Sequence, residues 1–260
     1  MVEETGMDSL RFNADLADEW LEADLHAWNL AEELLAMNLR IPFLPGDPLT
    51  FDEQFFEREV EGSLTLAESD VTYWLSFLPD GVPEGTGGLI SMEGELNGIA
   101  GNPYLAGRLT IREGLLSGME IDSLGLGVQY EHDSGTAMVN GSVVRESVPV
   151  LDFRSALPLD VDLRGGEVML PSGQDSVLVE LEALDFNLAM FGNYMPPDLV
   201  QNLEGILSGE ISLYGQMSEL EAEGQLRIRE GRLNAVPAGI TLQVISKRPV
   251  LRPCRLHSCA

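Results

Sequence analysis

The amino-acid sequence predicts an all-β protein built around one elongated antiparallel sheet. Three observations lead to this prediction: apolar and polar residues alternate along most of the chain, glycine-containing turns separate the alternating runs, and long stretches return after about 116 residues. Alternation with a period of two places apolar side chains on one face of a strand and polar side chains on the other. Such one-sided strands are typical of antiparallel sheets with one face in water.

Each alternating run supplies two or three large apolar residues to one face of its strand. In the run that begins at Gly107, for example, Leu109 and Ile111 alternate with Arg108 and Thr110. The runs together predict an apolar face that includes Ile90, Met92, Leu109, Ile111, Leu124, Leu126, Val128, Val177, Val179, Leu181, Leu226 and Ile228.

Short polar segments separate these runs. His132-Asp-Ser-Gly135, Arg164-Gly-Gly-Glu167 and Pro171-Ser-Gly-Gln174 have the composition of hairpin connections. Residues 31–37 have helical propensity, but their counterpart one repeat later reads Ser147-Val-Pro-Val150, which favours a strand.

Two segments interrupt the strands with a helical pattern, near residues 70–78 and 185–191. Each begins with an aspartate, Asp70 or Asp185, which is a favourable N-cap residue, and each ends near a proline. We therefore expect a short helical break at both places.

An internal repeat organises the chain. Gly107-Arg-Leu-Thr-Ile-Arg-Glu-Gly114 returns 117 residues later as Gly224-Gln-Leu-Arg-Ile-Arg-Glu-Gly231, and Asp70 matches Asp185 at an offset of 115. This register predicts one continuous sheet, because no linker separates the units. The expected divisions are a partial repeat at 1–82, a full repeat at 83–199, a partial repeat at 200–245 and an atypical basic tail at 246–260.

The charge of the chain is strongly acidic. The formal net charge is −28, and Lys247 is the only lysine. We expect no nucleic-acid partner, because such a surface repels polyanions. A lysine-poor acidic surface also suits a high-salt environment, in which dense ions screen self-repulsion.

The two ends carry little structural information. Both cysteines, Cys254 and Cys259, lie in the basic tail, which excludes a disulfide framework and suggests an artefact or a truncation scar. The N-terminus lacks the apolar region of a signal peptide, and no stretch is long and apolar enough to span a bilayer. We expect the chain to be a fragment of a longer protein.

No group of residues predicts catalysis or a metal site. Residues 131–133, Glu-His-Asp, suit a polar hairpin tip better than an acid–base site, and Asp160 and Asp162 suit a solvated strand face better than a calcium site. The triad of Cys254, His257 and Cys259 lacks zinc-site spacing. We therefore expect no enzyme, no metal and no cofactor.

The apolar face leaves two classes of function open. The predicted helices are too small to cover it, so either the sheet folds over on itself or the face lines a groove. A groove would hold acyl chains or unfolded β-strands. In the alternative, the chain is a secreted or cell-surface adhesion module whose apolar faces are covered and whose acidic face could bind calcium.

Four strings resemble one protein family in their order and recurrence. They are Gly88-Leu-Ile-Ser-Met-Glu-Gly-Glu-Leu-Asn-Gly98, Asn102-Pro-Tyr-Leu-Ala-Gly-Arg-Leu-Thr-Ile-Arg-Glu-Gly114, Gly205-Ile-Leu-Ser-Gly-Glu-Ile-Ser-Leu-Tyr-Gly215 and Glu223-Gly-Gln-Leu-Arg-Ile-Arg-Glu-Gly231. They resemble the β-rich repeats of TamB, the translocation and assembly module family within the AsmA-like, bridge-like lipid-transfer superfamily. The resemblance covers about residues 10–243, although the second copy has Met217-Ser-Glu-Leu220 where the first has a proline.

The resemblance implies a fold and a role. The fold would be a long twisted sheet bent into a groove, a β-taco, whose interior is lined by the twelve apolar residues. Its partners would be phospholipid acyl chains and an outer-membrane barrel assembly protein. The role would be lipid transport between membranes and assembly of outer-membrane proteins and autotransporters, in the periplasmic span of an inner-membrane-anchored protein. The family is not enzymatic and has no cofactor.

Overall fold

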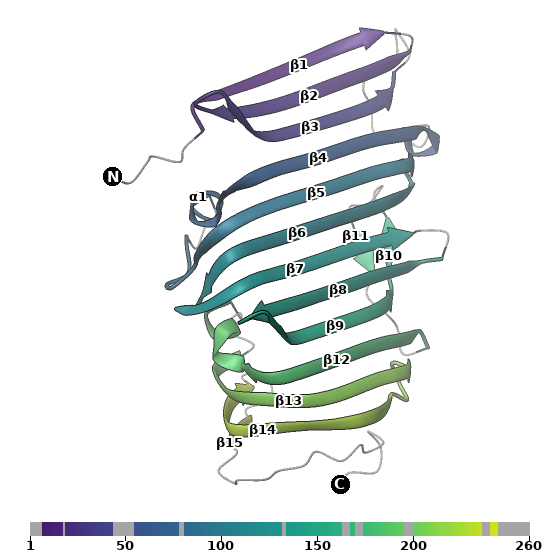
Figure 1. The fold of residues 1–260 in the computed structure, drawn as a ribbon. Helices are drawn as coiled ribbons and strands as arrows, with labels where there is room; N and C mark the ends of the chain where they lie inside the picture. The colour runs from purple at the N-terminus through teal and green to yellow at the C-terminus, as the bar shows by residue number, and fades with distance from the viewer. Residues whose placement is uncertain are drawn as a thin grey trace.

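Thirteen strands form a single sheet in which every neighbouring pair is antiparallel (Figure 1). The computed structural model describes residues 7–17, 19–43, 55–77, 81–131, 134–162, 167–169, 174–194, 200–235 and 240–243. The strands follow chain order from β1 to β9 and then continue through β12, β13, β14 and β15, while β10 and β11 form a separate hairpin. The all-β fold and the single elongated, twisted antiparallel sheet are thus confirmed.

Most strands are long, and the helical elements are short. The strands are β1 Ser9–Ala17, β2 Trp20–Asn29, β3 Glu32–Pro42, β4 Glu59–Asp70, β5 Gly87–Ile99, β6 Asn102–Leu116, β7 Met119–Glu131, β8 Thr136–Arg145, β9 Val148–Pro158, β10 Asp160–Asp162, β11 Glu167–Met169, β12 Ser176–Asn187, β13 Val200–Gln216, β14 Glu221–Ala235 and β15 Ile240–Gln243. The helical elements are η1 Phe55–Glu57, α1 Val71–Leu75 and η2 Leu188–Tyr194.

Several local predictions hold. Residues 31–37 lie at the start of β3, a strand as predicted. A turn at residues 134 and 135 joins β7 to β8. The other two predicted hairpin connections fall mainly on residues 163–166 and 170–173, which lie outside the described residues, as does the basic tail at 246–260.

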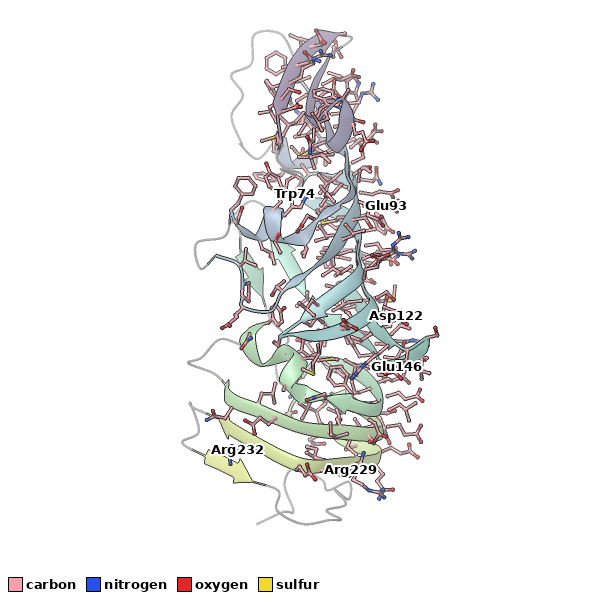
Figure 2. All side chains as sticks on the ribbon, turned by 60° about the vertical axis from the view of Figure 1, so that its left-hand side comes forward. Trp74, Glu93, Asp122, Glu146, Arg229 and Arg232 are labelled. Carbon is pink, nitrogen blue, oxygen red and sulfur yellow. The ribbon has the colours of Figure 1, made fainter. Side chains whose placement is uncertain are left out.

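The strand register separates two faces along the whole sheet. Leu109 on β6 lies opposite Met92 on β5 and Leu126 on β7, while Arg108 lies opposite Glu93 and Gly127. Directly opposed residues of antiparallel strands point to the same face, so apolar residues form rows that cross the sheet. Figure 2 shows Glu93 on the side of the sheet away from Trp74. We call the two sides the apolar face and the polar face.

The two helical breaks differ in how their N-cap residues agree with the prediction. α1 begins after Asp70, whose carboxylate accepts a hydrogen bond from the Thr72 N–H at 2.7 Å, as expected of an N-cap. The second break begins at Leu188, three residues later than predicted, and Asn187 caps it by accepting from the Ala189 N–H at 3.0 Å.

Asp185 does not cap the second break, because its backbone conformation and its contacts with Ser208 and Arg229 keep it in the strand. Its backbone has a left-handed φ of 48° at a β-bulge between Ala183 and Phe186. Its carboxylate accepts hydrogen bonds from Ser208 and, at 2.5 Å, from Arg229. The strand therefore continues to Asn187.

These contacts also correct the repeat register. Arg112 contacts Glu68 as Arg229 contacts Asp185, and Asp70 caps α1 as Asn187 caps η2. Each equivalence has an offset of 117 residues, which also relates the bulges of β4 and β12. The residue that occupies the position equivalent to Asp185 one repeat earlier is therefore Glu68 rather than Asp70.

The buried core is small and lies on the apolar face, mostly near the ends of interior strands. The larger cluster packs Phe186 and Met190, from the end of β12 and from η2, against Leu116, Ile121 and Val143. A smaller cluster joins Phe56 of η1 to Val60 and Ala100. Both clusters leave the middle of the apolar face outside the core.

Candidate functional site

The twelve apolar residues predicted from the sequence all lie on the apolar face. The register links Ile90 to Ile111 and Leu124, and it links Met92 to Leu109 and Leu126. Farther along the sheet, β9 bridges to β12, where Leu181 lies opposite Phe153 on one side and Ile211 on the other. Leu226 and Ile228 continue the face on β14, opposite Gly209 and Leu207. The sheet thus brings together residues from five strands.

This face is partly open to solvent. Val177 is buried, with 6% of its surface exposed, while Val128 is exposed at 40%. The other ten predicted residues are half-buried. This half-burial is intermediate between a closed core and a fully exposed surface. The side chains are covered by neighbouring strands of the same sheet, but within the part of the chain that the structure describes no second layer packs over most of the face.

η2 covers one part of the face. Leu124, Leu181, Leu226 and Ile228 pack against the cluster that contains Met190 of η2. These four side chains therefore contribute to the small core, whereas Met92, Leu109 and Leu126 lie outside the two core clusters. The predicted set thus divides into a covered part and an uncovered part.

Three contacts attach η2 to segments near the start of the same repeat. The hydroxyls of Tyr194 and Thr86 are 2.6 Å apart, Ser117 Oγ donates to the Met190 carbonyl at 3.0 Å, and Asn193 donates to the Glu84 carbonyl at 3.2 Å. Residues 84–86 precede β5, and Ser117 lies in the turn between β6 and β7. η2 therefore runs across the ends of interior strands and borders the apolar face.

α1 lies at the same ends of the strands, nearer the N-terminus of the chain. Trp74 donates its indole N–H to Ser69 Oγ at 2.8 Å, and Tyr73 packs edge-on against both Trp74 and Phe77. Phe77 is exposed. Figure 1 shows α1 and η2 at the same ends of the strands. The apolar face is therefore bordered by two short helical elements at one end of its strands.

The sequence-based set missed the N-terminal third of the apolar face. Leu25, Met37 and Leu64 form one row across β2, β3 and β4, and Leu35 and Leu66 form part of the next. Their alternation is readable in the sequence. Phe153 was also missed, although Leu151 and Phe153 alternate with Asp152 and Arg154 in the sequence. Its ring packs over Gly141 on the neighbouring strand.

The polar face is acidic and carries two open hollows. The larger, about 390 Å³, is lined by ten residues, among them Arg154 and five carboxylates, Asp152, Glu180, Glu182, Glu210 and Glu223. The smaller, about 370 Å³, lies over β5 to β8. Glu182 and Glu210 lie directly opposite each other on β12 and β13, a destabilising like-charge pair.

Most of the side chains considered as metal ligands from the sequence lie outside the described residues. Among the described residues, no group of three or more His, Cys, Asp or Glu side chains could hold a metal ion. His26 contacts Glu33 at 2.5 Å and stacks on Trp28. His132, the side chains of Asp160 and Asp162 and the cysteine-containing tail lie outside the description.

The fold and its two faces define a class: an open, single-sheet all-β protein with a half-exposed apolar face and an acidic polar face. Comparisons with protein-family models, with curated proteins and with solved structures found no match. Within the described part of the chain, none of the helices has the length and apolar character needed to cross a membrane.

Proposed function

We propose that the apolar face forms a groove that binds the acyl chains of phospholipids. The observation that carries this proposal is the continuous, half-exposed apolar surface centred on Met92, Leu109 and Leu126, which a single sheet leaves without a second layer. Extended exposed apolar surfaces mark interaction sites for proteins, membranes or apolar ligands.

The energetics favour an acyl chain as the ligand. Moving one methylene from water to an apolar surface contributes about 0.8 kcal/mol, so a chain lying across several strands gains substantially even with partial contact. The rows formed by Leu109, Leu126 and their neighbours run across the strands, along the long direction of the sheet. Acyl chains would lie along these rows, with head groups toward solvent.

The wider role follows from the family resemblance. We propose that the chain is part of a TamB-like envelope protein, located in the periplasmic span between two membranes. There it would take part in phospholipid transport and in the assembly of outer-membrane and autotransporter proteins together with a barrel partner. Such a role needs a continuous apolar path, and it needs neither catalysis nor a cofactor.

Mass spectrometry of lipids extracted from the purified chain tests the proposal. We expect phospholipid to co-purify with the wild-type protein. The double variant Leu109→Glu/Leu126→Glu places two charges in adjacent positions of the apolar face and should lose the lipid. Leu109→Thr/Leu126→Thr, which keeps strand propensity, should bind less lipid than the wild type.

A matched pair on the opposite face serves as the control. Thr110→Glu/Gln129→Glu alters the same two strands on the polar face and should leave lipid content unchanged. Circular dichroism establishes that each variant is folded. A wild-type chain without lipid, or folded apolar-face variants with normal lipid content, would contradict the proposal; the first result would favour the calcium-binding adhesion module instead.

A further inference from the structure

A row of exposed apolar side chains crosses four strands in the interior of the sheet. Met138 on β8 lies opposite Ala156 on β9. Leu178 on β12 lies opposite Ala156 on one side and Tyr214 of β13 on the other. Met138, Leu178 and Tyr214 are 47%, 39% and 37% exposed. We call these four residues the outer apolar row. Each of the four strands has a neighbour on both sides, so the exposure does not come from a missing strand.

The outer apolar row lies on the polar face, opposite the proposed lipid groove. Asn140 lies opposite Gly127, which lies opposite Arg108 of the polar face. Met138 is two positions from Asn140 on the same strand and therefore points to the same side. The row thus places apolar side chains where the alternation of the sheet otherwise places polar ones.

Structural landmarks identify the equivalent positions in the other repeat. The left-handed turn residues Leu30 and Ala31 correspond to Glu146 and Ser147 at an offset of 116 residues, which relates β2 and β3 to β8 and β9. The bulges of β4 and β12, and the left-handed glycines that end the pairing of β5 and β13, Gly98 and Gly215, correspond at an offset of 117.

The equivalent row in the other repeat is ionic. These offsets equate the outer apolar row with Glu22, Arg40, Glu61 and Asn97, which lie opposite one another in the same order. Arg40 contacts Glu22 at 3.1 Å and Glu61 at 3.4 Å. The same sheet therefore accepts charged residues at these positions, and the fold does not require the apolar side chains of the second row.

Carboxylates adjoin the outer apolar row on one flank only. The hollow of about 390 Å³ begins at Glu180, two positions from Leu178, and continues to Glu182 and Glu210. Arg154 also lines it, with its Nε 3.7 Å from a carboxylate oxygen of Asp152. The residues two positions away on the other flank carry no charge: they are Thr136, Pro158, Ser176 and Gln216.

We propose that the outer apolar row and the adjoining carboxylates bind a basic amphipathic helix of a partner protein. Neighbouring strands lie about 4.8 Å apart and one helical turn rises about 5.4 Å, so apolar side chains one turn apart can follow the row. Four strands span about 14 Å, which corresponds to between two and three turns. Lysine or arginine residues on one flank of that helix would lie over Glu180, Glu182 and Glu210.

Charge favours this occupant over a second copy of the chain. The net charge is −28, so two copies joined at this row would bring acidic faces together. Four side chains also bury far less than the roughly 800 Å² per partner of a standard stable interface, which suits a short segment rather than a folded protein. The proposal does not depend on the lipid groove, because the row lies on the opposite face.

Fluorescence anisotropy with a labelled synthetic peptide tests the site. The probe is a helical peptide of about 14 residues with leucines one turn apart and lysines along one flank, at about 0.15 M NaCl. We expect saturable binding to the wild-type chain. The row-swap variant Met138→Glu/Ala156→Arg/Leu178→Glu/Tyr214→Asn carries the residues of the ionic row, which the sheet accepts, and should bind at least about tenfold more weakly.

Matched variants separate this site from the rest of the surface. Glu180→Gln/Glu182→Gln should weaken binding and reduce its salt dependence, whereas Glu93→Gln/Glu95→Gln, at the same spacing on β5, should leave binding unchanged. The groove variant Leu109→Glu/Leu126→Glu should also bind the peptide normally. Circular dichroism establishes that each variant is folded.

Several outcomes would overturn the proposal. They are a wild-type chain that does not bind the peptide, a folded row-swap variant that binds like the wild type, and equal binding of a peptide with the same composition in scrambled order. A wild-type dimer that the row swap abolishes in sedimentation velocity would assign the row to a second copy. Tighter binding of a peptide with the sequence of residues 246–260 would assign it to the basic tail of the chain.

Discussion

The hydroxyl oxygen of Tyr194 lies 2.6 Å from that of Thr86, and the two residues are 108 positions apart in the chain. This hydrogen bond connects η2 of one repeat to the segment that precedes β5 of the same sheet. Because η2 covers part of the apolar face, the bond helps decide how much of that face remains open.

Removing the Tyr194 hydroxyl should loosen η2. Tyr194→Phe leaves the ring in place and should lower the free energy of unfolding by about 0.5–1.5 kcal/mol, the usual contribution of one hydrogen bond. Chemical denaturation measures the change. Tyr214→Phe is the matched control, since Tyr214 is exposed, and its effect should be smaller. Equal effects of the two substitutions would count against a role for this bond.

The two cap residues should each stabilise the start of a helical break. Asp70→Ala and Asn187→Ala each remove one side-chain acceptor from the first turn of a break, and each should cost about 1 kcal/mol. Asn140→Ala, on the polar face, should change stability by less than about 0.5 kcal/mol. Thermal unfolding of the three variants provides the measurement. A neutral Asn187→Ala would refute the assignment of Asn187 as the cap.

The packing of Phe153 over Gly141 should make that glycine intolerant of a side chain. A β-carbon at Gly141 would clash with the ring, so Gly141→Val should destabilise the sheet by about 1–3 kcal/mol. Combining it with Phe153→Leu should recover part of the loss, because the smaller side chain leaves room. Gly125→Ala, where the nearest atom is the Ser142 hydroxyl at 3.5 Å, should be tolerated. Additive effects in the double variant would exclude the steric explanation.

Salt should stabilise the sheet. Glu182 and Glu210 oppose each other across two strands beside Glu180 and Glu223, and screening weakens their repulsion. The free energy of unfolding should therefore rise between about 0.1 and 1 M NaCl. Glu182→Gln should raise stability at low salt and reduce the salt dependence. An unchanged unfolding midpoint over this range would show that the acidic face does not limit stability.

The sequence predicted the sheet and its two faces because both depend on local periodicity. Alternation in runs such as Leu109–Ile111 and Leu226–Ile228 identified the strands and the side to which their apolar residues point, whatever the neighbours. The start of the second helical break was wrong by three residues. The cap there depends on Arg229, 44 residues away, which binds Asp185 and leaves Asn187 to begin the turn.

By itself, the sequence determined the strand pattern, the polar and apolar faces and the repeat, since each follows from the order of side chains along an extended backbone. The tertiary structure decided which apolar residues are covered. Leu124 and Leu226 are separated by 102 residues, yet both pack against the cluster beneath η2, whereas Leu109 lies outside both clusters. Whether an apolar side chain is buried depends on which distant segment packs over its strand. The alternation of residues within the strand does not contain that information.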